Sequence, residues 1–464
     1  MSVSIERILQ TLDRAHNGPL CTQKEWNLKR IPTKVKQKLD EYRLRGTCDR
    51  ENPINADDRL ADEFFKAGFE LAVDLGMLCQ DTERVINVTG DELKDAIRRA
   101  PSELAIGEGV DRVVLRNRKP EDRIPPIIRA PLGNRLTEDI WVRVNQGIVE
   151  HREIDIFYGG TIMTIFGRPV MAGTPYETLV GRYQAQLTHE VLWRAGRMGM
   201  PTVAVSSSAT AFGQLGGFGI RGGFDPATSI AIILAPGELL TAYAVLHKVV
   251  HTLNCGAHFY VGTAPMIGGY AGPPEGTALV HIANVLLQFA VHHAHMYAAQ
   301  AHDVRYGGNC GREGLWVQSV ATQAISRNTH LMGTDPVAQV AGPCTEMLLY
   351  ESAVAMMGIT ASGVASVAVC RGSGSKYIDY TTPLEHKFCA EVGKRSAGMS
   401  RKQVNELAKA ILPEYEGQLF DPPKGKSVRE CYDLQTLQPT QEWLDTYVRI
   451  KKQLGEMGVP LEYP

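Results

Sequence analysis

Several side chains that can bind or transfer chemical groups stand just after short apolar runs of the chain. In chain order they are Tyr158, Ser206, Ser207, Tyr270, Arg305, Tyr306, Cys344, Glu346 and Arg371. Aromatic rings can hold a cation over their faces, and arginine can pair with an anion. The carboxyl group of Glu346 can pair with a cation, or protonate a leaving group when burial raises its pKa. These nine residues are therefore the candidates for a functional site.

Simpler structural roles remain open for several of these side chains. A serine after a strand is often a helix N-cap, and Arg305 could pair with a carboxylate of the protein. The glycine-rich turn around Tyr270 could be a tight loop without a ligand, whereas the turn that begins at Arg371 could hold an anion. The histidines of residues 292–295 fall inside an apolar helical stretch, without a cysteine or carboxylate at metal-ligand spacing. We therefore expect no metal site there.

The elements that must position these side chains alternate regularly from about residue 123. Eight short β-branched runs predict strands at 126–130, 154–160, 202–208, 229–236, 258–265, 304–308, 336–342 and 364–372. Helix-like segments between them lie at 176–197, 237–253, 275–302, 312–330 and 345–357. Strands that alternate with helices imply a parallel sheet, and eight of them over about 250 residues imply a closed barrel.

The sequence therefore predicts an α/β fold, a (β/α)8 barrel at residues 123–384. A helical and β extension (1–122) would pack on the barrel, and a helical segment (385–464) would follow it. An open doubly wound sheet is the alternative, but the turn after the first strand, Pro131-Leu132-Gly133-Asn134, lacks the Gly-x-Gly-x-x-Gly pattern. In a barrel the site lies at the carboxyl ends of the strands, where the nine candidates fall.

Composition excludes several classes of function. The 464 residues carry a formal net charge of −2, so the lysine and arginine that a nucleic acid or a polybasic membrane contact needs are not concentrated here. The start of the chain does not read as a signal peptide, and no apolar run is long enough to span a bilayer. Nine scattered cysteines without a Cys-x-x-Cys pair fit reduced thiols. We expect a cytoplasmic protein that binds neither nucleic acid nor membranes.

Five short motifs resemble one family over nearly the whole chain. They are CTQKEW at 21–26, AGFE at 67–70, GGYAG at 268–272, AGPCTEM at 341–347 and ECYD at 430–433. In this order they resemble the monomethylamine:corrinoid-protein methyltransferases of methylotrophic methanogens. The resemblance implies a barrel that forms a homo-oligomer (a hexamer, or a dimer or trimer) and passes a methyl group from methylamine to the cobalt of a partner corrinoid protein. The chain itself would bind no cofactor tightly, because the corrinoid is supplied by that partner.

One departure from the family concerns its pyrrolysine. Family members carry this residue in the barrel, shortly beyond an Ala-Gly-Arg turn. Here the turn is at 195–197, and the pyrrolysine position falls at about Val203. No lysine occurs between Lys119 and Lys248, so an ordinary lysine cannot replace it.

The family's neighbours of pyrrolysine differ as well. Two flanking glutamates match Ile232 and Gly262, and a nearby glutamine matches Pro336. Four linked differences predict a rebuilt pocket rather than a chance substitution. The family residues that remain are Tyr270, Arg305, Cys344 and Glu346.

The chemistry of these side chains, taken with the resemblance, gives each candidate an expected role. We expect Glu346, Tyr270 and Arg305 to be catalytic, and the substrate to contact Tyr158, Ser206, Ser207, Tyr306, Cys344 and Arg371. Without pyrrolysine to orient the amine, the donor must already be activated, as quaternary ammonium, sulfonium and protonated N-methyl compounds are. We predict methyl transfer from such an N-methyl compound, methylamine-like or quaternary, to a corrinoid protein. A barrel lyase or hydrolase that has lost corrinoid chemistry, and a non-catalytic assembly protein, are the alternatives.

Overall fold

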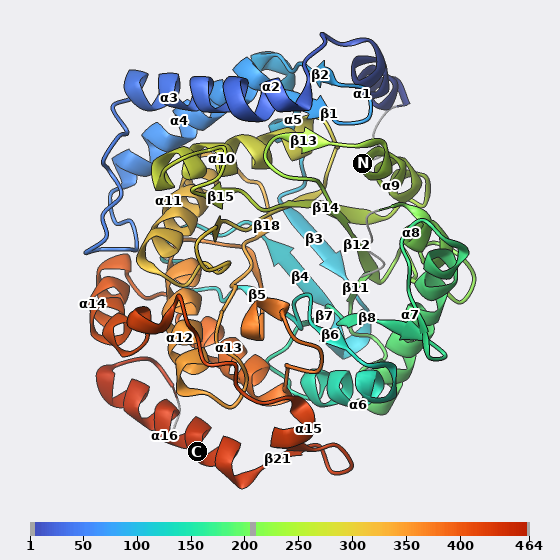
Figure 1. Cartoon of the computed structure of the whole chain (residues 1–464), viewed down its shortest axis with the longest axis vertical. Coiled ribbons are helices and arrows are strands. Elements are labelled where there is room, and N and C mark those ends of the chain that lie inside the picture. Colours follow the sequence, from blue (N-terminus) through green and yellow to red (C-terminus); the bar gives the residue numbers. More distant parts are fainter. Residues whose placement is uncertain (1–4, 205–209, 462–464) are drawn as a thin grey trace.

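A closed barrel of eight parallel strands forms the centre of the molecule (Figure 1). The computed structural model describes residues 5–204 and 210–461. In barrel order the strands are β5 (Ile127–Ala130), β7 (Ile156–Phe157), β11 (Thr202–Ala204), β12 (Ser229–Leu234), β14 (His258–Thr263), β16 (Met296–Ala299), β18 (Gly333–Thr334) and β19 (Ser366–Ala368). The pairing of β19 with β5 closes the barrel. The predicted (β/α)8 fold is confirmed.

Each of the eight barrel strands is followed in the chain by a helix that covers the barrel. These helices are α6 (Glu138–Val149), α7 (Pro175–Arg194), α8 (Phe212–Gly217), α9 (Tyr243–Asn254), α10 (Pro274–Ala290), α11 (Arg312–Asn328), α12 (Glu346–Ala361) and α13 (Pro383–Arg395). The helices α10, α11 and α12 are buried along nearly their whole length. A helix that is buried on all faces needs a second layer of structure over it.

Segments from both ends of the chain supply that second layer. The N-terminal helices are α1 (Ile5–Asn17), α2 (Gln23–Glu25), α3 (Ile31–Glu41), α4 (Asp58–Leu75) and α5 (Gly90–Arg99), and α4 packs on α10 and α11. The C-terminal helices are α14 (Arg401–Ile411), α15 (Val428–Cys431) and α16 (Gln441–Met457), and α14 and α16 pack on α12. Figure 1 shows the N-terminal helices in blue and the C-terminal helices in red on opposite sides of the barrel.

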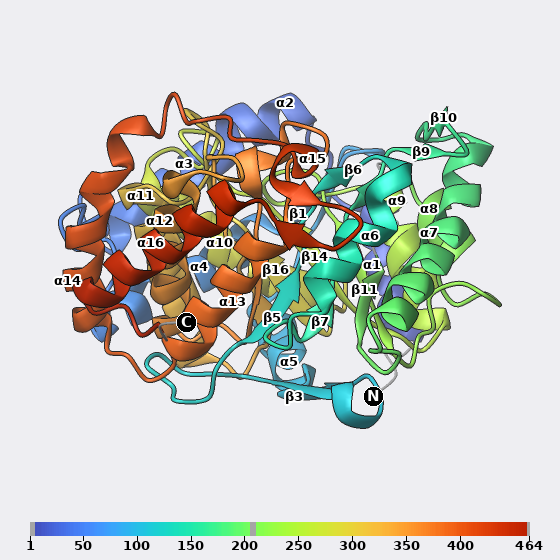
Figure 2. The same cartoon turned by 90° about the horizontal axis from the view of Figure 1, so that it is seen from below.

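A two-stranded hairpin closes the amino-terminal end of the barrel. Its strands are β3 (Glu103–Ile106) and β4 (Val113–Arg116), and the buried side chains of Leu104, Ile106 and Leu115 pack against residues inside the barrel. The backbone N–H of Glu108 donates to the carbonyl of Gly199, just before β11 begins. Figure 2 shows the hairpin at the opposite end of the barrel from β6 (Arg135–Leu136) and α15. The carboxyl ends of the strands are thus left as the open end.

Two of the eight strands lie elsewhere than the sequence predicts. The sixth strand is β16, not residues 304–308, and the seventh is β18, not residues 336–342. The helix predicted at 275–302 wrongly includes β16. The sequence did not mark its end, because the turn between α10 and β16 contains neither glycine nor proline. His293 takes the left-handed conformation there, with φ of 56°. Residues 336–342 are mostly apolar and buried, but Val340 and Ala341 donate their N–H groups to the carboxyl oxygens of Glu351, at 3.0 Å each, and form no strand.

The corrected strand also moves the histidines of residues 292–295. They lie in the turn after α10 and at the approach to β16, not in a helix as predicted. Within residues 5–204 and 210–461, no group of three or more His, Cys, Asp or Glu side chains is placed to hold a metal ion.

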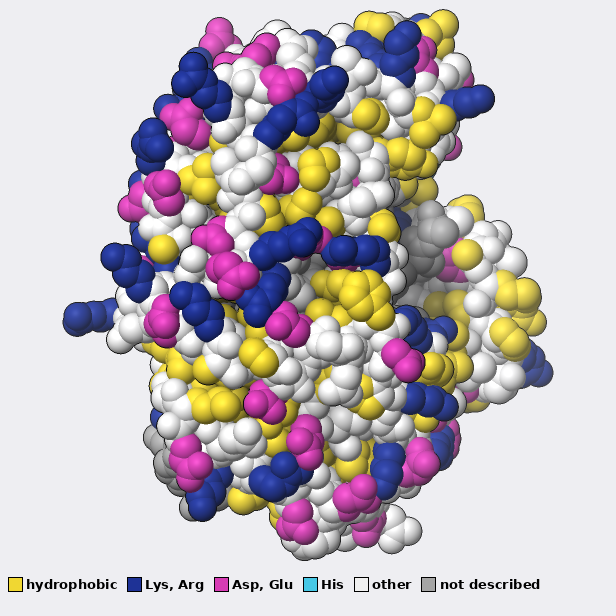
Figure 3. Space-filling view, turned by 60° about the vertical axis from the view of Figure 1, so that its left-hand side comes forward, with side chains coloured by type: hydrophobic (Ala, Val, Ile, Leu, Met, Phe, Trp, Pro, Cys, Tyr) yellow, Lys and Arg dark blue, Asp and Glu magenta, His cyan; other side chains and the backbone are white. Residues whose placement is uncertain are grey.

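The surface in Figure 3 mixes lysine and arginine with aspartate and glutamate and shows no stripe of one sign. None of the helices that the structure describes has the length and apolar character needed to cross a membrane.

Candidate functional site

A cavity of about 400 Å³ opens at the carboxyl ends of the barrel strands. Its lining residues lie in or just after seven of the strands; the residues that follow β11 are outside the described part of the chain. The polar lining residues are Tyr158, Thr161, Tyr260, Thr263, Gln300, His302, Thr334 and Arg371. The apolar ones include Leu132, Ile232, Leu234, Ala298, Ala299, Pro336 and Ala368. Polar groups that converge in an apolar cavity at this end of a barrel are typical of a binding site.

A pair of tyrosines lines one part of the cavity, and a buried arginine packs against one of their rings. The hydroxyl of Tyr260 donates to the hydroxyl of Tyr158 at 3.1 Å, and the guanidinium carbon of Arg129 lies 4.9 Å from the centre of the Tyr260 ring. Arg129 is fully buried, donates to the hydroxyl of Ser366 at 2.6 Å, and pairs with no carboxylate among the described residues. Burial raises the pKa of both tyrosines and lowers the pKa of Arg129. Both phenols are therefore neutral near neutral pH.

Arg371 and His302 form a second polar part of the lining. Nη1 of Arg371 lies 3.4 Å from Nε2 of His302, and Nδ1 of His302 lies 3.1 Å from the carbonyl oxygen of Gly307. A carbonyl oxygen only accepts, so Nδ1 carries the proton and the Nε2 lone pair faces Arg371. Burial, together with the positive charge of Arg371, lowers the pKa of His302 to about 4. His302 is therefore neutral near pH 7.

Acidic side chains are missing from the described lining of the cavity. Asp335 stands between the lining residues Thr334 and Pro336, but its carboxylate accepts a hydrogen bond from the hydroxyl of Thr322 on α11. The residues at 205–209 are valine, serine and alanine, so they bring no charge either. With His302 neutral, Arg371 is the charged residue of the described lining.

Of the nine candidates from the sequence, the structure brings Tyr158 and Arg371 to the cavity. Ser206 and Ser207 lie outside the described residues. Tyr270 is 45% exposed, in the loop between β15 (Met266–Ile267) and α10, and does not line the cavity.

Arg305 and Tyr306 lie beyond the cavity because the sixth strand ends earlier than the sequence predicts. Arg305 forms ion pairs with the carboxylates of Asp303 and Glu313, which is the simpler role left open for it. The hydroxyl of Tyr306 accepts a hydrogen bond from the N–H of Gly311 at 3.2 Å. The residues that line the cavity at the end of the sixth strand are instead Gln300 and His302, just after β16.

Cys344 and Glu346 also lie away from the cavity, because β18 ends at Thr334. Cys344 is half-buried, which raises the pKa of its thiol, and it takes the left-handed conformation before α12. Glu346 is the first residue of α12, is exposed, and forms an ion pair with Arg449 of α16. The buried carboxyl group expected of Glu346 is not found.

Six polar lining residues are not among the nine candidates. They are Thr161, Tyr260, Thr263, Gln300, His302 and Thr334. Two of them, Thr263 and Thr334, have buried hydroxyl oxygens without a hydrogen-bond partner among the described residues. The alternation of side chains along a strand could have found Tyr260, two positions before Gly262, because residues i and i+2 face the same side. Gln300 and His302 could have been found from a strand at 296–299. In the sequence this strand cannot be told apart from the apolar helix that precedes it.

Three of the four positions singled out by the resemblance line the cavity: Ile232, Gly262 and Pro336. Val203, the fourth, is buried in the apolar cluster that also contains Ile232, Tyr158 and Tyr260. The four positions at which the resemblance predicts a difference from the family therefore belong to the lining or to this cluster.

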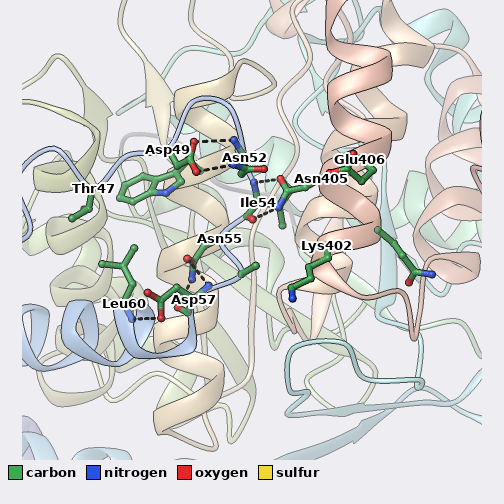
Figure 4. Close-up of a pocket in the computed structure, with 13 residues that line it drawn as sticks. Thr47, Asp49, Asn52, Ile54, Asn55, Asp57, Leu60, Lys402, Asn405 and Glu406 are labelled. Carbon is green, nitrogen blue, oxygen red and sulfur yellow. Dashed lines mark hydrogen bonds between the residues drawn. The ribbon is translucent and has the colours of Figure 1, made fainter.

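A second cavity, of about 710 Å³, lies between the segment before α4 and helix α14 (Figure 4). Its polar groups bind one another: the Asn52 amide donates to Asp49 at 2.9 Å, and Asn405 exchanges two hydrogen bonds with the backbone of Ile54. These contacts join the N-terminal extension to the C-terminal helices. We therefore place the candidate site in the barrel.

Comparisons with known proteins agree over nearly the whole chain. The family model described as monomethylamine methyltransferase MtmB matches residues 6–459. The monomethylamine methyltransferase MtmB of Methanosarcina mazei is 30% identical over 448 residues, which cover 96% of this chain and 97% of that protein. MtmB3 of Methanosarcina barkeri is also 30% identical, with the same coverage.

Solved structures are similar over the same length. The crystal structure of the Methanosarcina barkeri monomethylamine methyltransferase has a TM-score of 0.93 at 28% identity and covers 97% of this chain and 98% of that one. The crystal structure of the hydroxylamine complex of MtmB has the same TM-score and coverage at 29% identity.

Proposed function

Because the chain belongs to the monomethylamine methyltransferase MtmB family, we propose that it transfers a methyl group from an N-methyl compound to the cobalt of a corrinoid protein, without pyrrolysine. The observation that carries the proposal is the cavity at the open end of the barrel. Ile232, Gly262 and Pro336 line this cavity in place of the two glutamates and the glutamine of the family pattern. The cavity is thus the donor site, rebuilt for a donor that needs no pyrrolysine.

The proposed reaction breaks a carbon–nitrogen bond and forms a cobalt–carbon bond. Cobalt(I) of the partner's corrinoid supplies the electron pair for the new bond, and nitrogen leaves with the electrons of the old one. A nitrogen that is already positive leaves as a neutral amine, so a quaternary or protonated N-methyl group suits this reaction. The chain would bind and orient the donor and exclude water from it. Its apolar lining, including Ile232, Leu234 and Ala298, suits methyl groups.

The corrinoid enters this proposal on a partner protein that docks over the open end of the barrel, and the chain holds no cofactor of its own. We also propose that the chain works in the cytoplasm as a homo-oligomer. Exposed apolar side chains on α7 and α8 support a contact between subunits: Leu179, Trp193 and Phe212 are 57%, 69% and 48% exposed. Light scattering on the purified protein measures the oligomeric state.

An anaerobic methyl-transfer assay tests the proposed function. The pure protein is mixed with a co-encoded corrinoid protein in the cobalt(I) state, and N-methyl donors are added one at a time. We expect a donor-dependent absorbance change from cobalt(I) to methyl-cobalt(III). The proposal fails if a broad panel of donors gives no change while a known methyltransferase methylates the same corrinoid protein.

A further inference from the structure

The charge of the barrel cavity does not suit a donor that is only a cation. Within the described lining, the charge near neutral pH is the guanidinium of Arg371. A second guanidinium, that of Arg129, lies behind the ring of Tyr260 and is also without a carboxylate partner among the described residues. A lone methylammonium ion would meet the guanidinium of Arg371, with that of Arg129 behind Tyr260, and no counterion among the described lining residues. Like charges in a poorly solvated site repel strongly, so a bare cation is disfavoured.

Arg371 has donors free for a ligand. Its backbone N–H donates to the side-chain oxygen of Gln339 at 2.9 Å, which anchors the residue just after β19. Its guanidinium makes two long contacts, 3.4 Å from Nε to the hydroxyl of Ser375 and 3.4 Å from Nη1 to His302. A guanidinium carries five N–H groups in a planar fork, which matches the two oxygens of a carboxylate. Most of that fork is therefore available to an anion in the cavity.

The cavity also offers partners beyond Arg371 and room beyond methylamine. Thr263 and Thr334 lie in the lining and are 6% and 1% exposed, and their hydroxyls have no hydrogen-bond partner among the described residues. Buried hydroxyls of this kind are normally satisfied, here by a ligand or by water. A volume of about 400 Å³ is in the range of small-molecule sites, whereas methylamine has two heavy atoms.

We propose that the methyl donor is an N-methylated amino acid whose carboxylate pairs with Arg371 while its N-methyl groups lie against the apolar lining. This inference rests on the proposed function and names its substrate class. The donor brings its own negative charge, which replaces the carboxylates that the family pattern has at positions 232 and 262. In the transfer step, the C–N bond breaks and the amino acid leaves with one methyl group fewer and a neutral nitrogen. The methyl group passes to cobalt(I) of the corrinoid protein.

Equilibrium binding to the purified protein tests the carboxylate without any corrinoid. The probes are sarcosine, N,N-dimethylglycine and N,N,N-trimethylglycine, compared with choline, tetramethylammonium and methylammonium, and isothermal titration calorimetry gives each Kd. Choline keeps the trimethylammonium group of trimethylglycine and has a hydroxyl in place of the carboxylate. We expect at least one carboxylate probe to bind at least tenfold more tightly than choline. The proposal is overturned if no carboxylate probe binds, or if choline binds as tightly as the tightest of the carboxylate probes.

Variants of Arg371 test whether this side chain causes the preference for carboxylate probes over choline. Arg371→Gln should weaken binding of the carboxylate probe at least tenfold and leave choline unchanged, and Arg371→Lys should fall between the two proteins. Arg116→Gln is the matched control, because Arg116 lies on the hairpin at the closed end, exposed and paired with Glu103. Unchanged carboxylate affinity in a folded Arg371→Gln protein, with the melting temperature of wild type, would overturn the assignment.

The two readouts separate this inference from the proposed function. Carboxylate-dependent binding without methyl transfer to cobalt supports the inference about the site and contradicts the proposed reaction. Methyl transfer from choline or methylammonium, but from no carboxylate probe, supports the proposed reaction and overturns the inference.

Discussion

Ile232 lies in the cavity lining, at a position where the resemblance implies a glutamate in the family. A hydrocarbon side chain then stands in place of a carboxylate, beside a site whose described charge is that of Arg371. At the residue scale, we expect this side chain, together with Arg371, to set which sign of charge the cavity accepts. It can therefore be used to reverse the preference.

Ile232→Glu should shift ligand preference from carboxylates toward cations. The new carboxylate competes for Arg371 and attracts a bare ammonium group, so the ratio of trimethylglycine affinity to tetramethylammonium affinity should fall at least roughly tenfold, about 1.4 kcal/mol. Calorimetry measures both affinities. Ile232→Gln is the control, because it adds a polar group of the same length without charge. Identical ratios in the Glu and Gln variants would contradict the argument.

At the scale of elements, Glu351 links α12 to the segment after β18, so a change there tests how these two elements are held together. Burial raises the pKa of its carboxyl group from 4.5 to about 8, and its oxygens accept N–H bonds from Val340 and Ala341. Between pH 4.5 and 8 the folded protein holds a proton that the unfolded chain has released. The free energy of unfolding therefore falls as pH rises through this window.

Replacing this carboxyl group should flatten the alkaline side of the stability profile. We expect the loss of Tm between pH 6 and pH 9 to be smaller by a few degrees in Glu351→Gln than in the wild type, since the amide cannot ionise. Part of the loss should persist, because burial also raises the pKa of Glu385 to about 7. Glu346→Gln is the matched control on the same helix, at an exposed position. Equal losses in all three proteins would rule out Glu351 as a cause.

The elements also show why the fold could be predicted and most of the site could not. Alternating strands and helices leave a repeating pattern, and six of the eight strands were found where that pattern placed them. The pattern failed at β16, since the chain passes from a buried helix to a buried strand through His293 without glycine or proline. Once that strand is displaced, the residues expected at its end, Arg305 and Tyr306, are displaced from the cavity too. Tyr158 and Arg371 follow correctly predicted strands, and both line it.

At the scale of the whole molecule, buried histidines set the acid limit of stability. Burial lowers the pKa of six of them from 6.5 to about 3 or 4: His151, His292, His293, His295, His302 and His386. Below pH 6.5 the unfolded chain takes up protons that the folded protein excludes, so stability is lost as pH falls toward 4. Differential scanning calorimetry should show Tm falling steeply from pH 6.5 to pH 4.5. A constant Tm over that range would contradict the burial of these rings.

The hairpin of β3 and β4 has a kinetic consequence under the proposed function. Because the hairpin closes the amino-terminal end, the small donor and the large corrinoid protein must both approach the cavity from the open, carboxyl-terminal end of the barrel. A docked corrinoid protein then blocks the donor from entering, and the demethylated product from leaving. Steady-state kinetics should therefore be ordered, with the donor adding first, and a large excess of corrinoid protein should inhibit turnover. Random addition without such inhibition would mean that the donor reaches cobalt by another route.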